Sequence, residues 1–99
     1  MPGPLDGIRI LDFTRYQQGP FATVLLSDLG ADVLKVEEPK NGDLGRSLGR
    51  QSDGFCAYFE AHNRNKRSLT VDLRTDEGRE IILKLNFYFL NQFFQPQHL

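Results

Sequence analysis

The chain has 99 residues, enough for one small domain whose margin of stability is thin. Its formal net charge is -1, because 12 Lys and Arg residues nearly balance 13 Asp and Glu residues, and this balance gives no reason to expect nucleic acid or a membrane as a partner. The single cysteine, Cys56, excludes an internal disulfide framework. We also find no secretory signal, no transit peptide and no apolar run near the roughly 20 residues that span a bilayer, so we expect a cytoplasmic location, with a mitochondrial one left open for a eukaryotic parent.

Residues 5–38 predict a strand, a turn, a helix and a second strand. The apolar side chains of 8–13 form a run of strand length, as in a strand buried on both faces. A helix opens at Pro20, because proline is favoured at the first helical position. It ends before Gly30, where a left-handed residue is favoured. A second apolar run, 31–37, then has the character of a strand.

A strand–helix–strand unit of this length is the building block of an open parallel sheet. The predicted fold class is therefore α/β: an incomplete Rossmann-like parallel sheet, made of strand–helix–strand and then strand–helix. The first turn, 14–19, lies at the carboxyl end of a strand and the amino end of a helix, which is where such sheets bind ligands.

The second half of the chain predicts a long loop followed by shorter elements. Residues 39–54 are rich in Gly, Asp, Asn and Ser, which is typical of a surface loop. One or two helical turns are expected over 55–61, then a polar, basic connection over 62–67, and then a strand over 68–73. Thr75 is suited to cap a second helix, and the acidic residues after it suit the positive end of the helix dipole.

Residues 86–99 differ from the rest of the chain. Charges vanish there, and four of the eight Phe residues fall in this segment. It is either a helix extension that buries aromatic side chains against the sheet or a terminus without a packing partner, and we favour the second interpretation. Exposed aromatic clusters promote association.

Four blocks follow one another along the chain: LDGIRILDFT at 5–14, Gly-Pro with LGADV and KVE within 19–37, Gly-Asp at 42–43, and NKRS with DL and EG within 65–78. In this order they resemble the amino-terminal part of the class III coenzyme A transferases of the CaiB/BaiF type, a group related to the alpha-methylacyl-CoA racemases. The resemblance covers about 4–85, so we divide the chain into a family segment over 4–85 and a non-family aromatic tail over 86–99.

The resemblance implies a Rossmann-like domain built from both ends of a long chain, in an interlocked homodimer. Such enzymes move coenzyme A from an acyl-CoA to a small carboxylic acid, so coenzyme A is a substrate and no tightly bound cofactor is expected. An aspartate attacks the thioester to give a mixed anhydride and then an aspartyl-CoA thioester. In the family this nucleophile lies downstream of the residues present here. We therefore assign no catalytic residue and expect the short chain to be inactive.

The resemblance also implies a set of coenzyme-A-binding residues. The turn is expected to hold the thioester end and pantetheine arm, and the segment after the third strand is expected to hold the adenosine end, with its basic residue near phosphate. These positions are Gln17, Gln18, Val71, Asp72, Leu73 and Arg74. Amide side chains and helix-terminus N–H groups suit polar ligand atoms, and a guanidinium suits phosphate. Glu38 stands where formyl-CoA transferases have an arginine, which argues against a formyl-CoA donor.

Several alternatives stay open. The first blocks do not separate a transferase from an acyl-CoA racemase fragment, and the chain is also compatible with a non-catalytic short form acting through its aromatic tail. Asp12 is expected to orient the following turn rather than act as a catalytic carboxylate. The basic connection is either a phosphate-binding patch or, as we prefer, structural or solvated. The spacing of His62 and His98 does not indicate a metal site.

Overall fold

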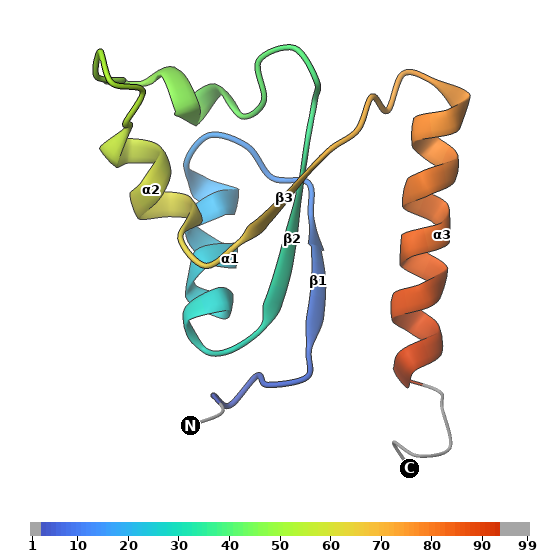
Figure 1. Cartoon of the computed structure of the whole chain (residues 1–99). Coiled ribbons are helices and arrows are strands. Elements are labelled where there is room, and N and C mark those ends of the chain that lie inside the picture. Colours follow the sequence, from blue (N-terminus) through green and yellow to red (C-terminus); the bar gives the residue numbers. More distant parts are fainter. Residues whose placement is uncertain (1–2, 94–99) are drawn as a thin grey trace.

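The sheet has three parallel strands in the order β1-β2-β3. They are β1 (Arg9–Asp12), β2 (Asp32–Glu37) and β3 (Arg67–Thr70) in a computed structural model that describes residues 3–93. Arg9 pairs with Asp32 across the first ladder, and Leu34 pairs with Arg67 across the second. The α/β fold class with a parallel Rossmann-like arrangement is confirmed (Figure 1).

The helices lie on both faces of this sheet. The helices α1 (Gln18–Asp28) and α2 (Ala57–Asn63) and the 3-10 helix η1 (Leu44–Ser47) form one group, and α3 (Asp76–Phe93) stands apart on the far side of β1 (Figure 1). Successive side chains of a strand point to opposite faces. Asp12 accordingly faces α1, where it accepts a hydrogen bond from Thr23, and Leu11 lines a cleft against α3.

The core lies between the sheet, α1 and the loop before α2. Its most buried apolar side chains are Val24, Ala31, Val33, Val36, Cys56 and Val71. The valines of β2 are inaccessible or nearly so because that strand is central and paired on both sides. The single thiol, that of Cys56, is buried in this core.

Two element boundaries next to the predicted binding segments differ from the sequence predictions. Helix α1 begins at Gln18 rather than at Pro20, which is possible because the N–H groups of the first helical turn have no intrahelical partner and the missing proline N–H costs nothing there. Strand β3 ends at Thr70 instead of 73, although the Val71 N–H still donates to the Glu37 carbonyl over 2.9 Å. Gly30 has φ +107°, which is the left-handed residue predicted after α1.

Helix α3 continues beyond the expected end of the second helix. It runs without a break from Asp76 to Phe93, so residues 86–93 extend this helix. Two of its aromatic side chains are not buried against the sheet: Phe87 is 65% exposed and Tyr88 is 54% exposed. The division of the chain at 85 stays a prediction. Residues 94–99, with His98, lie outside the described part.

A cleft of about 490 Å³ separates α3 from β1. Its walls include Leu11 and Phe13 on one side and Ile82 and Phe89 on the other. The guanidinium of Arg9 crosses the gap and lies 5.6 Å from the ring centre of Phe89. The far face of the sheet is therefore covered only in part.

Candidate functional site

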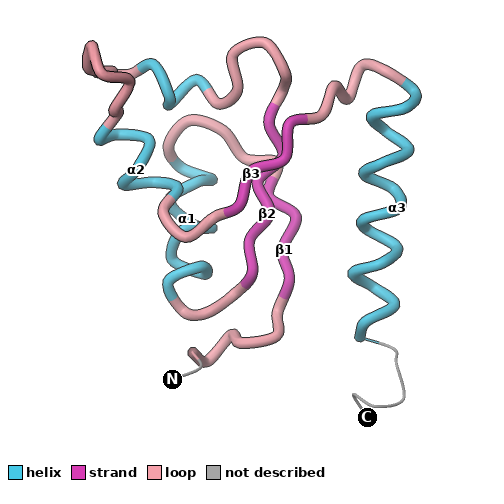
Figure 2. The backbone as a smooth tube through the Cα atoms, in the orientation of Figure 1, coloured by secondary structure: helices cyan, strands magenta, loops and turns pink. Residues whose placement is uncertain are grey.

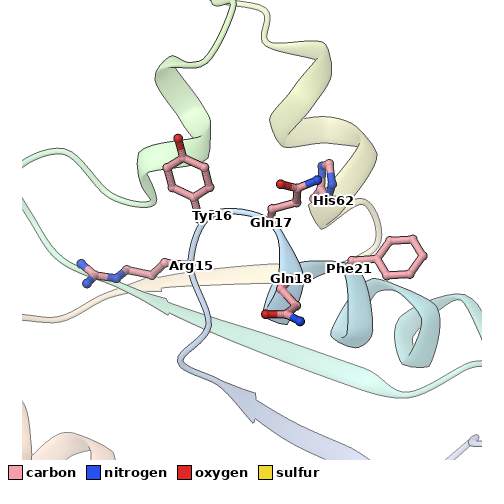
Figure 3. A pocket seen from close by; sticks show the side chains of 6 residues that line it. All are labelled: Arg15, Tyr16, Gln17, Gln18, Phe21 and His62. Carbon is pink, nitrogen blue, oxygen red and sulfur yellow. The ribbon is translucent and has the colours of Figure 1, made fainter.

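The connections that leave the carboxyl ends of the three strands lie at one edge of the sheet (Figure 2). The connection after β1 forms a wall of a cleft of about 790 Å³. Figure 3 shows the side chains that line this cleft, which come from the turn, from α1 and from α2: Arg15, Tyr16, Gln17, Gln18, Phe21 and His62. The predicted pair Gln17 and Gln18 therefore lies on a real concave surface at the expected edge.

Asp12 organises the start of this turn. Its Oδ1 accepts the Thr14 N–H over 2.8 Å, and its Oδ2 accepts the Thr23 hydroxyl over 2.8 Å. The Lys66 ammonium lies 3.0 Å from the same Oδ2. Burial opposes ionisation of Asp12, but the bonds from Thr14, Thr23 and Lys66 outweigh it, so its pKa lies below the ordinary 3.8. The prediction that Asp12 orients the turn is confirmed.

A second buried ion pair holds the middle of the turn. The Lys35 ammonium lies 2.6 Å from Asp43 Oδ2, and the two side chains are 1% and 0% exposed. Lys35 also donates to the Thr14 carbonyl over 3.1 Å, and Asp43 Oδ1 accepts the Tyr16 N–H over 2.8 Å. Burial raises the pKa of Asp43, but the bonds from Lys35, Gly45 and Tyr16 lower it further, so the net pKa lies below 3.8.

A third buried carboxylate, Glu37, lies at the end of β2. Arg46 donates two hydrogen bonds to it, each of 2.7 Å, in the bidentate geometry that suits guanidinium and carboxylate. Ser68 and the Asp43 N–H donate as well. Burial disfavours the charged form of Glu37, but the bonds from Arg46, Ser68 and Asp43 prevail and lower its pKa from 4.5 to about 2.

Sequence reasoning missed the ion pairs that Lys35 and Glu37 make. A signal was present, because both residues alternate with apolar residues in a run that was predicted to be an apolar strand of a parallel sheet, and strands of parallel sheets are commonly buried. Charged groups in such a strand require buried partners of opposite charge. Their partners, Asp43 and Arg46, sit in the loop that the sequence described only as polar.

The second predicted segment, 71–74, follows β3 at the same edge but does not line the cleft. Strand β2 separates it from the turn. Val71 is buried, whereas Leu73 is 41% exposed. The carboxylate of Asp72 accepts bonds from the backbone N–H and the guanidinium of Arg74, each of 3.0 Å, and the pairing raises the pKa of Arg74. The Nη2 group of Arg74 also donates to Asp72 over 3.2 Å, and the Arg74 side chain is 83% exposed.

The basic connection before β3 is structural. Lys66 is buried against Asp12, as described above, and Arg64 pairs with Asp28 over 2.5 Å. Arg67 pairs with Asp32 over 2.8 Å. These cations are therefore used within the fold, and the preferred structural interpretation of this segment agrees with their contacts.

No helix within residues 3–93 is long and apolar enough to cross a bilayer. In the same range, no three His, Cys, Asp or Glu side chains are grouped so as to hold a metal ion.

The segment that carries the three strands, the turn and the four sequence blocks matches a known family. The family model described as CoA-transferase family III matches residues 5–86. The chain belongs to this family.

Two curated relatives show how far the similarity extends. The chain is 49% identical over 88 residues to a succinyl-CoA:mesaconate CoA-transferase of Haloarcula hispanica, an alignment that covers 84% of this chain and 22% of the relative. It is 48% identical over 83 residues to a succinyl-CoA:glutarate CoA-transferase of Mus musculus, with coverage of 83% and 19%. The chain thus spans about a fifth of the length of these relatives.

Solved structures agree with the sequence relatives. The D175A mutant of Rv3272 from Mycobacterium tuberculosis superposes with a TM-score of 0.76 at 44% identity, covering 85% of this chain and 22% of that one. A CAIB/BAIF family protein from Brucella suis superposes with a TM-score of 0.74 at 46% identity, covering 83% and 23%.

Proposed function

We propose that this family III chain forms the amino-terminal, coenzyme-A-contacting part of a transferase that moves coenzyme A from an acyl-CoA to a free carboxylic acid. The observation that carries the proposal is the cleft at the carboxyl edge of the parallel sheet, whose wall is the turn bearing Gln17 and Gln18. Relatives named as CoA-transferases support the reaction class. Coenzyme A enters this scheme as a substrate, without a tightly bound cofactor.

The two ends of coenzyme A are assigned to different segments. No side chain caps α1, so the N–H groups of Gln18 and Gly19 at its start are left for a ligand, next to the amide side chains of Gln17 and Gln18. Together they offer donors and acceptors to the amide groups of the pantetheine arm. The exposed Arg74 and Leu73 suit the phosphate and purine of the adenosine end, which reaches them across the end of β2. Phosphate competes with Asp72 for the Arg74 guanidinium.

The cleft of this chain does not by itself complete the family reaction. The reaction implied by the family needs an aspartate that attacks the thioester carbonyl, and the six residues that line the cleft include neither Asp nor Glu. We therefore propose that the short chain binds coenzyme A weakly and does not turn over. In the full-length relatives the remaining four-fifths of the chain and a second subunit would supply the rest of the site.

Titration of the ¹⁵N-labelled chain with coenzyme A tests this proposal. We expect saturable changes of backbone resonances at Gln17, Gln18 and 71–74. The double variant Q17A/Q18A is expected to lose the first group and R74A the second. The matched control is R67A, because Arg67 is another exposed arginine that pairs with an aspartate, Asp32, but lies at the amino end of β3 rather than at the carboxyl edge of the sheet.

The outcomes separate the candidate functions. Equal responses to coenzyme A, NAD and ATP would indicate a generic nucleotide-binding module and contradict the assignment of the pantetheine arm. Absence of any response to coenzyme A would reject the site. Turnover of succinyl-CoA with a dicarboxylic acid by the purified chain would overturn the proposed inactivity.

A further inference from the structure

The turn that forms one wall of the cleft contains a strained residue. Tyr16 has φ +81°, in the left-handed region that side chains other than glycine rarely adopt. It stands between Arg15 and Gln17, and all three line the cleft. A backbone held in this region returns to an extended or helical conformation unless neighbouring groups oppose the change. The shape of the wall therefore depends on what holds Tyr16.

One buried ion pair holds the backbone on the amino-terminal side of that residue. Asp43 accepts the Tyr16 N–H over 2.8 Å, and Lys35 donates to the Thr14 carbonyl over 3.1 Å. The two charged groups lie 2.6 Å apart and are almost completely buried. Neither side chain lines the cleft, so neither contacts a ligand bound there.

The pair is itself fixed from several directions. Asp43 Oδ1 also accepts the Gly45 N–H over 2.9 Å, and the Asp43 N–H donates to Glu37 over 2.9 Å. The Asp43 carboxylate is held by η1 and Lys35, and its backbone is held by Glu37, so this residue has little freedom to follow the turn if the turn moves. The pair is thus a rigid anchor rather than a flexible link.

We propose that Asp43 and Lys35 are positioning residues that hold the left-handed Tyr16 backbone, so that the wall bearing Gln17 and Gln18 is formed before ligand binds. This inference rests on the proposed function, because it takes coenzyme A as the ligand of the cleft. A preformed wall raises affinity. When only a fraction of the protein molecules is in the binding-competent conformation, the apparent affinity is reduced by that fraction.

Three variants and one control test the proposal in the full chain. D43A removes the acceptor for the Tyr16 N–H, and K35M keeps the aliphatic stem but removes the ammonium. K35M/D43N removes both charges while keeping an amide oxygen for the Tyr16 N–H. The control is G30A, which is expected to destabilise the fold at the opposite edge of the sheet, where Gly30 has φ +107° and approaches Gly3.

The readouts are the Tyr16 amide resonance and the affinity for coenzyme A. We expect D43A and K35M to shift or broaden the Tyr16 resonance and to weaken coenzyme A binding by roughly tenfold, as for a wall populated about a tenth of the time. Relative to D43A, K35M/D43N is expected to recover part of both, because an amide oxygen again accepts the Tyr16 N–H. G30A is expected to leave both unchanged despite its lower stability.

A purely structural role gives a different pattern. If D43A and K35M lower stability but keep the wild-type Tyr16 resonance and affinity, or if G30A changes them equally, the positioning role is overturned. If D43A does not fold, K35M and K35M/D43N decide the question by the same criteria. If the wild-type chain does not bind coenzyme A, the proposed function fails alone, and the Tyr16 resonance still decides whether the pair holds the turn.

Discussion

Replacing Glu37 by glutamine tests whether a buried charge pair stabilises this small domain. Glutamine keeps the size of the side chain and one carbonyl oxygen, but it loses the negative charge that faces Arg46. It also cannot accept both guanidinium bonds, which measure 2.7 Å each in the native pair. Ser68 and the Asp43 N–H compete for the remaining oxygen.

The size of the effect follows from the pKa of Glu37. A pKa lowered from 4.5 to about 2 corresponds to roughly 3 kcal/mol of stabilisation at neutral pH. Because Arg46 is 42% exposed, solvent replaces part of the lost interaction. We therefore expect E37Q to lower the free energy of unfolding by about 2 kcal/mol at pH 7. Because the pKa of Glu37 is lower in the folded protein than in the unfolded chain, this stabilisation is fully present above pH 4.5. It is lost as the pH falls toward 2.

Urea unfolding followed by far-ultraviolet circular dichroism measures this difference. The free energies of unfolding of wild type and E37Q are compared at pH 7, 4.5, 3 and 2. The other carboxylates titrate in both proteins, so their contributions cancel in the difference between the two free energies. The matched control is E80Q, because Glu80 is exposed and pairs with Lys84 along the surface of α3. That control is expected to change stability by less than about 0.5 kcal/mol. Equal stabilities of wild type and E37Q at pH 7, or a difference that does not shrink below pH 4.5, would refute the reasoning.

Three further substitutions probe the fold by the same unfolding measurement. V33A removes two methyl groups from a fully buried position in the central strand, so we expect a loss of about 2 kcal/mol, and a loss below about 0.5 kcal/mol would mean that β2 is not the core strand. G30A places a Cβ at φ +107°, only 3.1 Å from the Gly3 Cα, and is expected to cost more than about 1 kcal/mol; a neutral effect would contradict the left-handed turn. T75A removes the acceptor of the Gly78 N–H at the start of α3, a bond of 3.0 Å, and is expected to cost about 1 kcal/mol, which an unchanged midpoint would disprove.

The local elements were predictable because their signals are local. Gly30 and Thr75 mark helix ends through backbone preference and capping, which act over a few residues. The same is true of the turn that carries Gln17 and Gln18, because any strand followed by a helix in a parallel sheet places its connection at the ligand-binding edge.

The partners of the buried charges were not predictable in this way. Lys35 and Glu37 are adjacent to apolar residues in a strand, and the sequence does not say which of many charged residues neutralise them. Asp43 and Arg46 become their partners only when the loop after β2 folds back over the strand end. His62 joins the cleft for a similar reason, since α2 packs beside α1.

The sequence by itself determined the parallel α/β order, the position of the turn and the family blocks, because periodicity and turn chemistry depend on neighbours along the chain. Only the tertiary structure decided that Val71 is buried while Leu73 and Arg74 are exposed, and that a buried Lys35–Asp43 pair holds Tyr16. The physical reason is that burial and charge pairing depend on residues brought together through space, whose sequence separation carries no signal of their contact.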